Sequence, residues 1–232
     1  MRIAALTGAG ISAESGVPTF RGAAGLWHDH RPEDLATPTA FRRDPQLVWE
    51  FYAWRRELVS KCKPNQAHLI LAEMQFHNIE SYIITQNVDG LHQKAGSIDV
   101  IELHGSLWKL KCTHCDHHWG AVDVPLPELP PSCPICRKLA RPDVVWFGET
   151  LDAGVLNRSL KVVSEVDLIL VIGTSALVNP AAHLPRIGKE NGATIIEINP
   201  EGTPVSGIAD EVYREPATSG LMKWWQQFLK NN

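Results

Sequence analysis

The 232-residue sequence lacks the features that mark membrane, secreted and nucleic-acid-binding proteins. It has no apolar run of about 18 residues, so no membrane-spanning helix is expected. The net charge is −4 and no basic cluster extends beyond the pairs Arg42–Arg43 and Arg55–Arg56, which argues against nucleic acid as a partner. The apolar start Met1–Leu6 is too short for the core of a signal peptide. We therefore expect a cytoplasmic protein that binds neither membranes nor nucleic acid.

Cysteine is also scarce, and four of the five cysteines form two Cys-x-x-Cys pairs. Their spacing is typical of a zinc ribbon, and without a secretory signal metal binding is favoured over disulfides. Four thiolates complete the tetrahedral shell of zinc and leave no position open for water or substrate, so we predict one structural Zn²⁺. The alternatives are disulfides or a catalytic metal that recruits His114, His117 or His118. The predicted ligands are Cys112, Cys115, Cys133 and Cys136.

Short runs of Ile, Leu and Val alternate with stretches of helical periodicity. Continuous apolar runs of this length suit the strands of a parallel sheet that is covered on both faces. We predict an α/β fold, a Rossmann-like doubly wound parallel sheet with a small zinc-ribbon and helical second domain. The predicted strands are Ile3–Leu6, Ser81–Ile84, Val100–Leu103, Leu168–Ile172 and Thr194–Ile198. The predicted helices are Asp44–Ser60, with an apolar stripe at Leu47, Phe51, Trp54 and Leu58, then Asn65–His77 and Ser219–Lys230.

Each predicted strand is followed by small or polar residues. Because ligands bind at the carboxyl ends of strands in open α/β sheets, five such ends indicate a lined cleft. The alternative is that these residues only form turns, which Gly and Asn also favour. The segments are Thr7–Ala13, Thr85–Gly90, His104–Gly105, Gly173–Ser175 and Asn199–Glu201.

The first of these segments fits a dinucleotide fingerprint, Gly8-x-Gly10-x-x-Ala13. Its glycines would let backbone amides approach a pyrophosphate. The acidic residue that usually ends the second strand is missing, because Asp29 lies in the irregular segment Gly16–Pro38. We therefore expect a modified nucleotide site rather than a plain Rossmann dehydrogenase.

Taken together, these motifs resemble those of the sirtuin family. The resemblance implies an NAD⁺-dependent deacylase whose partners are acylated-lysine proteins or peptides. The amide oxygen of the acyl-lysine attacks the ribose carbon that bears nicotinamide, and the acyl group moves to ADP-ribose. The residues that carry the resemblance are Gly8–Gly16, Pro18–Arg21, Thr85–Asp89, His104–Gly105, the two cysteine pairs, Phe147–Glu149, Gly173–Ser175 and Ile198–Asn199.

The resemblance also assigns roles to single residues. His104 is the implied general base for a ribose hydroxyl, a task that suits an imidazole with a pKa near neutrality. Asn87 and Asp89 are the implied ribose and nicotinamide contacts, with an Asx turn as the alternative. The full set of expected cofactor contacts is Gly8, Ala9, Gly10, Ser12, Ala13, Glu14, Phe20, Arg21, Gln86, Asn87, Asp89, Gly173, Thr174, Ser175, Asn199, Pro200 and Glu201.

For the substrate, the peptide is expected to add as a strand beside Phe147–Glu149. Tyr52 and Arg55 match the Tyr-x-x-Arg signature of class III sirtuins, the branch that removes succinyl, malonyl and glutaryl groups. Residues three apart share a helix face, so the tyrosine can donate a hydrogen bond while the arginine pairs with a carboxylate. Alternatively, Tyr52 borders the core and Arg55 is solvated like its neighbour Arg56. The expected substrate contacts are Ala36, which enlarges the acyl pocket, and Tyr52, Arg55, Val144, Phe147, Gly148 and Glu149.

The chain is accordingly divided into three parts. We expect a Rossmann-like NAD-binding domain over residues 1–34, 81–108 and 143–232, a helical module over 35–80 that lines the acyl pocket, and a zinc-binding insert over 109–142. Three other functions stay open: an NAD-consuming ADP-ribosyltransferase or hydrolase, a non-catalytic NAD-sensing zinc module, and an oxidoreductase. Only deacylation would yield free lysine and O-acyl-ADP-ribose.

Overall fold

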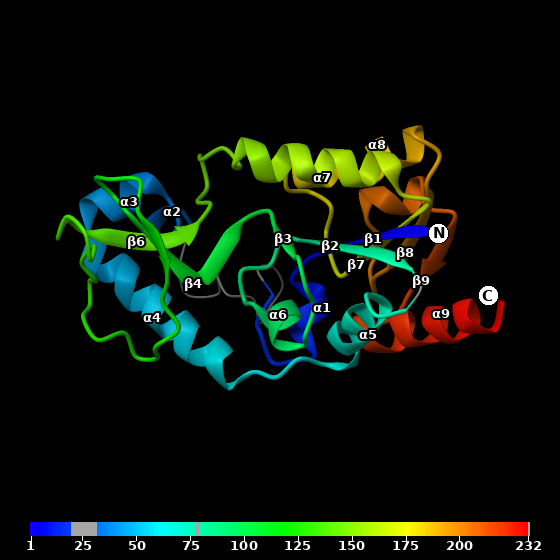
Figure 1. Cartoon of the computed structure of the whole chain (residues 1–232), viewed down its shortest axis with the longest axis horizontal. Coiled ribbons are helices and arrows are strands. Elements are labelled where there is room, and N and C mark those ends of the chain that lie inside the picture. The colour runs from blue at the N-terminus through cyan, green and yellow to red at the C-terminus, as the bar shows by residue number, and fades with distance from the viewer. Residues whose placement is uncertain (20–31, 78, 232) are drawn as a thin grey trace.

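The computed structural model describes residues 1–19, 32–77 and 79–231. A larger α/β part lies at one end of the long axis, and a smaller part built around α4 and β6 lies at the other end (Figure 1). In the part of the chain that the structure describes, no helix combines the length and the apolar character needed to cross a bilayer.

The larger part is built on a six-stranded sheet with the order β3-β2-β1-β7-β8-β9, and every neighbouring pair is parallel. The predicted Rossmann-like sheet is therefore confirmed. From β1 the chain adds strands first on one side (β2, β3) and then on the other (β7, β8, β9), so the strand order switches between β1 and β7. Open α/β sheets bind ligands at such a switch point. The strands are β1 (Arg2–Thr7), β2 (Glu80–Thr85), β3 (Ile101–Glu102), β7 (Leu168–Ile172), β8 (Thr194–Ile198) and β9 (Glu211–Tyr213). The sequence analysis missed the short β9.

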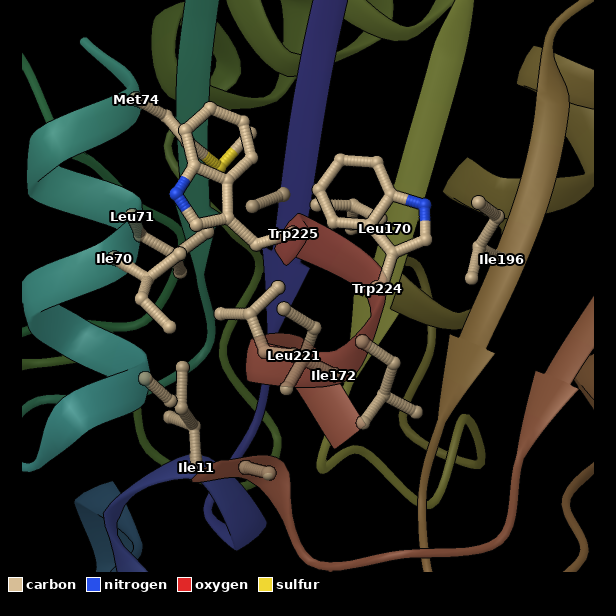
Figure 2. Close-up of a cluster of buried hydrophobic side chains, with 14 of the residues drawn as sticks. Ile11, Ile70, Leu71, Met74, Leu170, Ile172, Ile196, Leu221, Trp224 and Trp225 are labelled. Carbon is tan, nitrogen blue, oxygen red and sulfur yellow. The ribbon is translucent and has the colours of Figure 1, made fainter. Parts of the chain in front are cut away.

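Helices cover both faces of this sheet, as the continuous apolar strands require. Side chains alternate along β1, with Ile3 and Ala5 in one core and Ala4 and Leu6 in the other. On the first face α5 (Gln66–Met74) and α9 (Ala217–Asn231) pack together, and Figure 2 shows their side chains gathered against β7 and β8. On the second face lie α7 (Ala153–Glu165) and α8 (Leu184–Glu190), neither of which was predicted. Shorter elements are α1 (Gly10–Ala13), α6 (Leu91–Lys94), η1 (Ala181–His183) and η2 (Pro204–Gly207).

The smaller part combines a three-stranded antiparallel sheet with helices. The sheet has the order β5-β4-β6, formed by β4 (Gly105–Cys112), β5 (His118–Gly120) and β6 (Ala140–Val144). The boundaries predicted at 108/109 and 142/143 therefore fall inside β4 and β6, and the three-part division of the chain stays a prediction. The helices are α2 (Pro32–Leu35), α3 (Pro38–Arg43) and α4 (Pro45–Lys61).

Helix α4 buries only part of the apolar stripe that was predicted for it, since Phe51 is buried and Leu58 is half-buried but the other two residues are not. Leu47 is 40% exposed and Trp54 is 47% exposed. The helix starts as expected, because the Asp44 carboxylate caps it by accepting a bond from the Leu47 amide at 2.9 Å. The face turned toward the small sheet includes polar side chains that find partners there, so apolar spacing alone identified only part of the buried face. The buried residues are Val48, Trp49, Phe51, Tyr52, Arg55, Arg56 and Val59.

Candidate active site

The backbone segments that follow β1 and β7 are in direct contact at the point where the strand order switches. The Gly8 amide donates to the Ile172 carbonyl at 3.0 Å, and the Gly10 amide donates to the Gly173 carbonyl at 2.8 Å. A Cβ on Gly8 would lie 2.8 Å from the Gly173 oxygen, and one on Gly10 would lie 2.7 Å from the Gly173 Cα. Gly173 itself has φ +60°. The glycines are therefore required for these two loops to pack, before any ligand is considered.

A buried polar cluster stands behind this contact. The Ser12 hydroxyl donates to Asp89 Oδ2 at 2.8 Å, and Asn87 Nδ2 donates to the Ser12 hydroxyl and to the Gly8 carbonyl, both at 3.1 Å. Asp89 Oδ1 also accepts from the Leu91 amide at 2.9 Å, so the Asx turn forms as well. Burial raises the pKa of Asp89, while its bonds from Leu91 and Ser12 oppose that shift. The loops after β1 and β2 thus join in one hydrogen-bonded unit.

Thr174 ties together the loops that follow three strands. Its hydroxyl accepts from Gln86 Nε2 at 2.9 Å, and its carbonyl accepts from Asn199 Nδ2 at 2.9 Å. Ser175, Pro200 and Glu201 are exposed next to this junction. The structure therefore brings the predicted polar strand ends together along one edge of the sheet.

His104 follows β3 and contacts the same edge. Its Nδ1 lies 3.0 Å from the Gln86 carbonyl oxygen, which can only accept, so Nδ1 carries the hydrogen and Nε2 keeps a free electron pair. Burial lowers the pKa of His104, and the bond to Gln86 partly opposes that shift. The imidazole is therefore neutral at pH 7 and its Nε2 can accept a proton.

The two neighbouring arginines of α4 have different environments. Arg56 donates to the carbonyls of Leu107, Ala121 and Asp123, so it fastens α4 to the small domain. Arg55 is only 9% exposed, and its guanidinium carbon lies 5.6 Å from the centroid of the Tyr52 ring. Burial lowers the pKa of Arg55, and the nearby Tyr52 oxygen and Asp89 carboxylate oppose that shift. Neither arginine is therefore solvated, and Arg55 faces the same region as the cluster around Asp89.

The predicted peptide-binding segment lies next to Ala36. The Phe147 amide donates to the Ala36 carbonyl at 3.0 Å. Ala36 and Val144 are buried, Phe147 is 53% exposed, and Gly148 is exposed with φ +86°. These four predicted substrate residues are brought together.

Glu149 and Glu14 were expected to contact ligands, but their carboxylates accept hydrogen bonds from other residues of the protein. Glu149 accepts from Arg141 Nη1 at 2.6 Å, from Arg141 Nη2 at 2.9 Å and from the Trp146 amide at 2.9 Å. Glu14 accepts from the Thr218 amide at 3.0 Å and from its hydroxyl, at the start of α9. Phe20 and Arg21 lie outside the described residues.

Two buried histidines that the sequence analysis did not select support the polar cluster. His68 Nε2 lies 3.4 Å from the Ser12 hydroxyl, and His92 Nε2 lies 2.9 Å from the Thr7 hydroxyl. Their rings are 4.9 Å apart. Burial lowers the pKa of His68 to about 4 and that of His92 to about 3, so both are neutral at pH 7. A sequence signal existed, because His68 lies three positions before the buried Leu71 on the same face of α5.

The four predicted metal ligands form one cluster. Their sulfur atoms all lie within 4.8 Å of one another, with Cys112–Cys136 at 3.4 Å, Cys115–Cys136 at 3.6 Å and Cys115–Cys133 at 3.8 Å. Tetrahedral zinc with Zn–S bonds of about 2.3 Å requires sulfur separations of about 3.8 Å. All four thiols are free, so the cluster is not a pair of disulfides.

The nearby histidines have other partners. His117 stacks on Trp119, with ring centroids 5.2 Å apart, and His118 bonds to Asp143 at 2.8 Å. Among the described residues, these four cysteines are the only set of three or more His, Cys, Asp or Glu side chains close enough together to hold a metal ion. The donor set therefore fits a closed, structural zinc site.

Comparison with known proteins agrees with this geometry. The family model described as the Sir2 family matches residues 8–180. The chain is 54% identical over 223 residues to the NAD-dependent protein deacylase of Aquifex aeolicus (strain VF5), covering 96% of this chain and 93% of that protein. A solved Sir2 homologue in complex with NAD is 49% identical, covers 99% of this chain and 90% of its own, and superposes with a TM-score of 0.93. An ADP-ribose complex of a mutant Sir2 homologue is 48% identical with a TM-score of 0.95, covering 99% and 92% of the two chains.

Proposed function

This chain belongs to the Sir2 family, and from that premise we propose that it is an NAD-dependent protein-lysine deacylase that prefers succinyl, malonyl and glutaryl groups to acetyl. The observation that carries the acyl preference is the burial of Tyr52 and Arg55 side by side on α4.

The strand ends supply the parts that such a reaction needs. The acyl amide oxygen forms a bond to the ribose carbon, and nicotinamide leaves with the electron pair of its bond. His104 Nε2 is placed to take a proton from a ribose hydroxyl, which a neutral imidazole can do. The cluster of Ser12, Asn87 and Asp89 is fixed by internal hydrogen bonds, so its remaining polar atoms are held in place for the nucleotide. The deprotonated ribose hydroxyl then bonds to the acyl carbon, the amide C–N bond breaks, and one water molecule supplies the remaining oxygen and protons. The products are free lysine, nicotinamide and O-acyl-ADP-ribose.

Acyl selection depends on charge. The guanidinium of Arg55 can form two parallel hydrogen bonds to a terminal carboxylate, whereas an acetyl group offers it no carboxylate. Because Arg55 is buried, little water screens this interaction. Removing one partner of a buried charge pair costs about 3–5 kcal/mol, which corresponds to about 10²- to 10⁴-fold in kcat/KM.

The test compares peptides of one sequence that carry either succinyl-lysine or acetyl-lysine, with products identified by mass. We expect Arg55→Met to lower kcat/KM for the succinyl peptide by about 10²- to 10⁴-fold and to change deacetylation much less. Arg42→Met removes an exposed arginine and serves as the matched control, and His104→Ala is the inactive reference. An equal loss of both activities in Arg55→Met, or a wild-type enzyme that favours acetyl, would contradict the acyl preference. ADP-ribosylated protein without free lysine would contradict deacylation itself.

A further inference from the structure

The hydroxyl of Tyr52 has a buried partner that fixes its hydrogen-bonding role. Trp146 Nε1 donates to the Tyr52 oxygen at 2.8 Å, and both side chains are almost fully buried. We propose that Trp146 is a positioning residue that turns the Tyr52 hydroxyl into a donor for the acidic acyl group. This inference rests on the proposed acyl preference.

The reasoning follows from the donor and acceptor inventory of the three groups. A phenol can donate or accept, but an indole N–H can only donate, so Tyr52 must act as the acceptor toward Trp146. The phenolic hydrogen then has to point away from Trp146. It cannot be given to Arg55, because a guanidinium has no acceptor atom. A carboxylate only accepts, so a terminal carboxylate beside Arg55 matches the direction that Trp146 imposes.

The phenol also keeps the hydrogen that this role requires. Burial raises the pKa of Tyr52, and the nearby Arg55 charge and the Trp146 bond only partly oppose that shift. A hydroxyl that accepts one strong hydrogen bond becomes a better donor in its own. Tyr52 is therefore a neutral, polarised donor at pH 7.

Trp146 is held rigidly by the segment that is proposed to bind the peptide. The guanidinium carbon of Arg141 lies 3.3 Å from the centroid of the Trp146 ring. Glu149 clasps this guanidinium with both oxygens and accepts the Trp146 amide as well. On its other side the ring packs on Phe41 at 5.2 Å. One chain of contacts thus runs from Glu149 through Arg141 and Trp146 to Tyr52, and it places the Glu149 carboxylate in a supporting role.

The experiment removes the indole N–H and keeps an aromatic ring. In Trp146→Phe we expect kcat/KM for the succinyl peptide to fall about 10-fold or more, because a hydrogen bond to a charged group loses its oriented donor, with deacetylation changed less than about 3-fold. Trp49→Phe is the matched control. Trp49 is another buried indole of the same domain, and its Nε1 donates to the Ala140 carbonyl at 2.9 Å rather than to the Tyr52 oxygen. This control should leave the succinyl-to-acetyl ratio unchanged.

A double-mutant cycle separates orientation from packing. Tyr52→Phe should lower the succinyl-to-acetyl ratio by itself, and adding Trp146→Phe should then change the ratio no further. The inference is overturned if Trp146→Phe leaves the ratio at the wild-type value, if its effect persists in the Tyr52→Phe background, or if Trp49→Phe shifts the ratio equally. Should Trp146→Phe fail to fold, Tyr52→Phe alone decides, because an unchanged ratio there removes the hydroxyl from selection. A wild-type enzyme without succinyl preference would refute the proposed function instead, so the two failures are distinguishable.

Discussion

Gly8→Ala tests whether the first glycine serves the fold or only the ligand. Gly8 has an ordinary backbone conformation, so alanine adds only a methyl group. That methyl would lie 2.7 Å from Thr174 Cβ, 2.8 Å from Thr174 Cα and 2.8 Å from the Gly173 oxygen. None of these atoms belongs to a flexible side-chain end, so relief requires the loops after β1 and β7 to separate. Such overpacking costs about 1–3 kcal/mol.

The assay is thermal unfolding of the protein without NAD. In a chain of this size 1 kcal/mol corresponds to about 2–4 °C, so Tm should fall by about 2–12 °C. Gly207→Ala is the matched control, because its Cβ would meet no atom within 4 Å, and its Tm should stay near that of the wild type. NAD affinity should also drop, since the Gly8 carbonyl accepts from Asn87. An unchanged Tm together with weakened NAD binding would refute the packing argument and leave close approach to the pyrophosphate as the reason for glycine.

Two further predictions concern the zinc site and the buried histidines. Metal analysis should find one zinc per chain. A strong chelator or Cys112→Ser should lower Tm sharply, because a structural zinc can supply about 10–16 kcal/mol of folding free energy. Unchanged stability without zinc would contradict a structural role. In the folded chain the pKa of His68 is about 4 and that of His92 is about 3, both below the ordinary 6.5. Their contribution to the free energy of unfolding is therefore complete above pH 6.5 and is lost as the pH falls from 6.5 through these two values. Urea unfolding at pH 7.5 and 4.5 should show a loss of roughly 2–3 kcal/mol per histidine in the wild type and a shallower loss in His68→Gln, and equal pH slopes would contradict the assignment.

Much of the site could be located from sequence because its parts are short and local. Each predicted strand is recognised by a continuous apolar run, and the polar residues at its carboxyl end follow directly in the sequence. Parallel strands bring those ends to one edge, so the meeting of Asn87, Thr174, His104 and Asn199 follows from chain order and sheet direction. The spacing of the two Cys-x-x-Cys pairs likewise predicted which four side chains form the metal cluster.

The remaining features depend on partners that are distant in the chain. Apolar spacing identified only part of the buried face of α4, because that face also depends on partners outside the helix, including carbonyls for Arg56 and the indole of Trp146 for Tyr52. Glu149 was expected at the substrate, but Arg141 competes for its carboxylate, and no local pattern reports such a competition.

The sequence by itself determined the parallel sheet, the ligand-binding edge and the four zinc ligands, since each is encoded by a period or a spacing along the chain. Only the tertiary structure decided which arginine of α4 lies beside Tyr52 and which histidines support Ser12. Those choices depend on the burial and hydrogen-bond partners that each side chain meets once segments far apart in sequence have packed together.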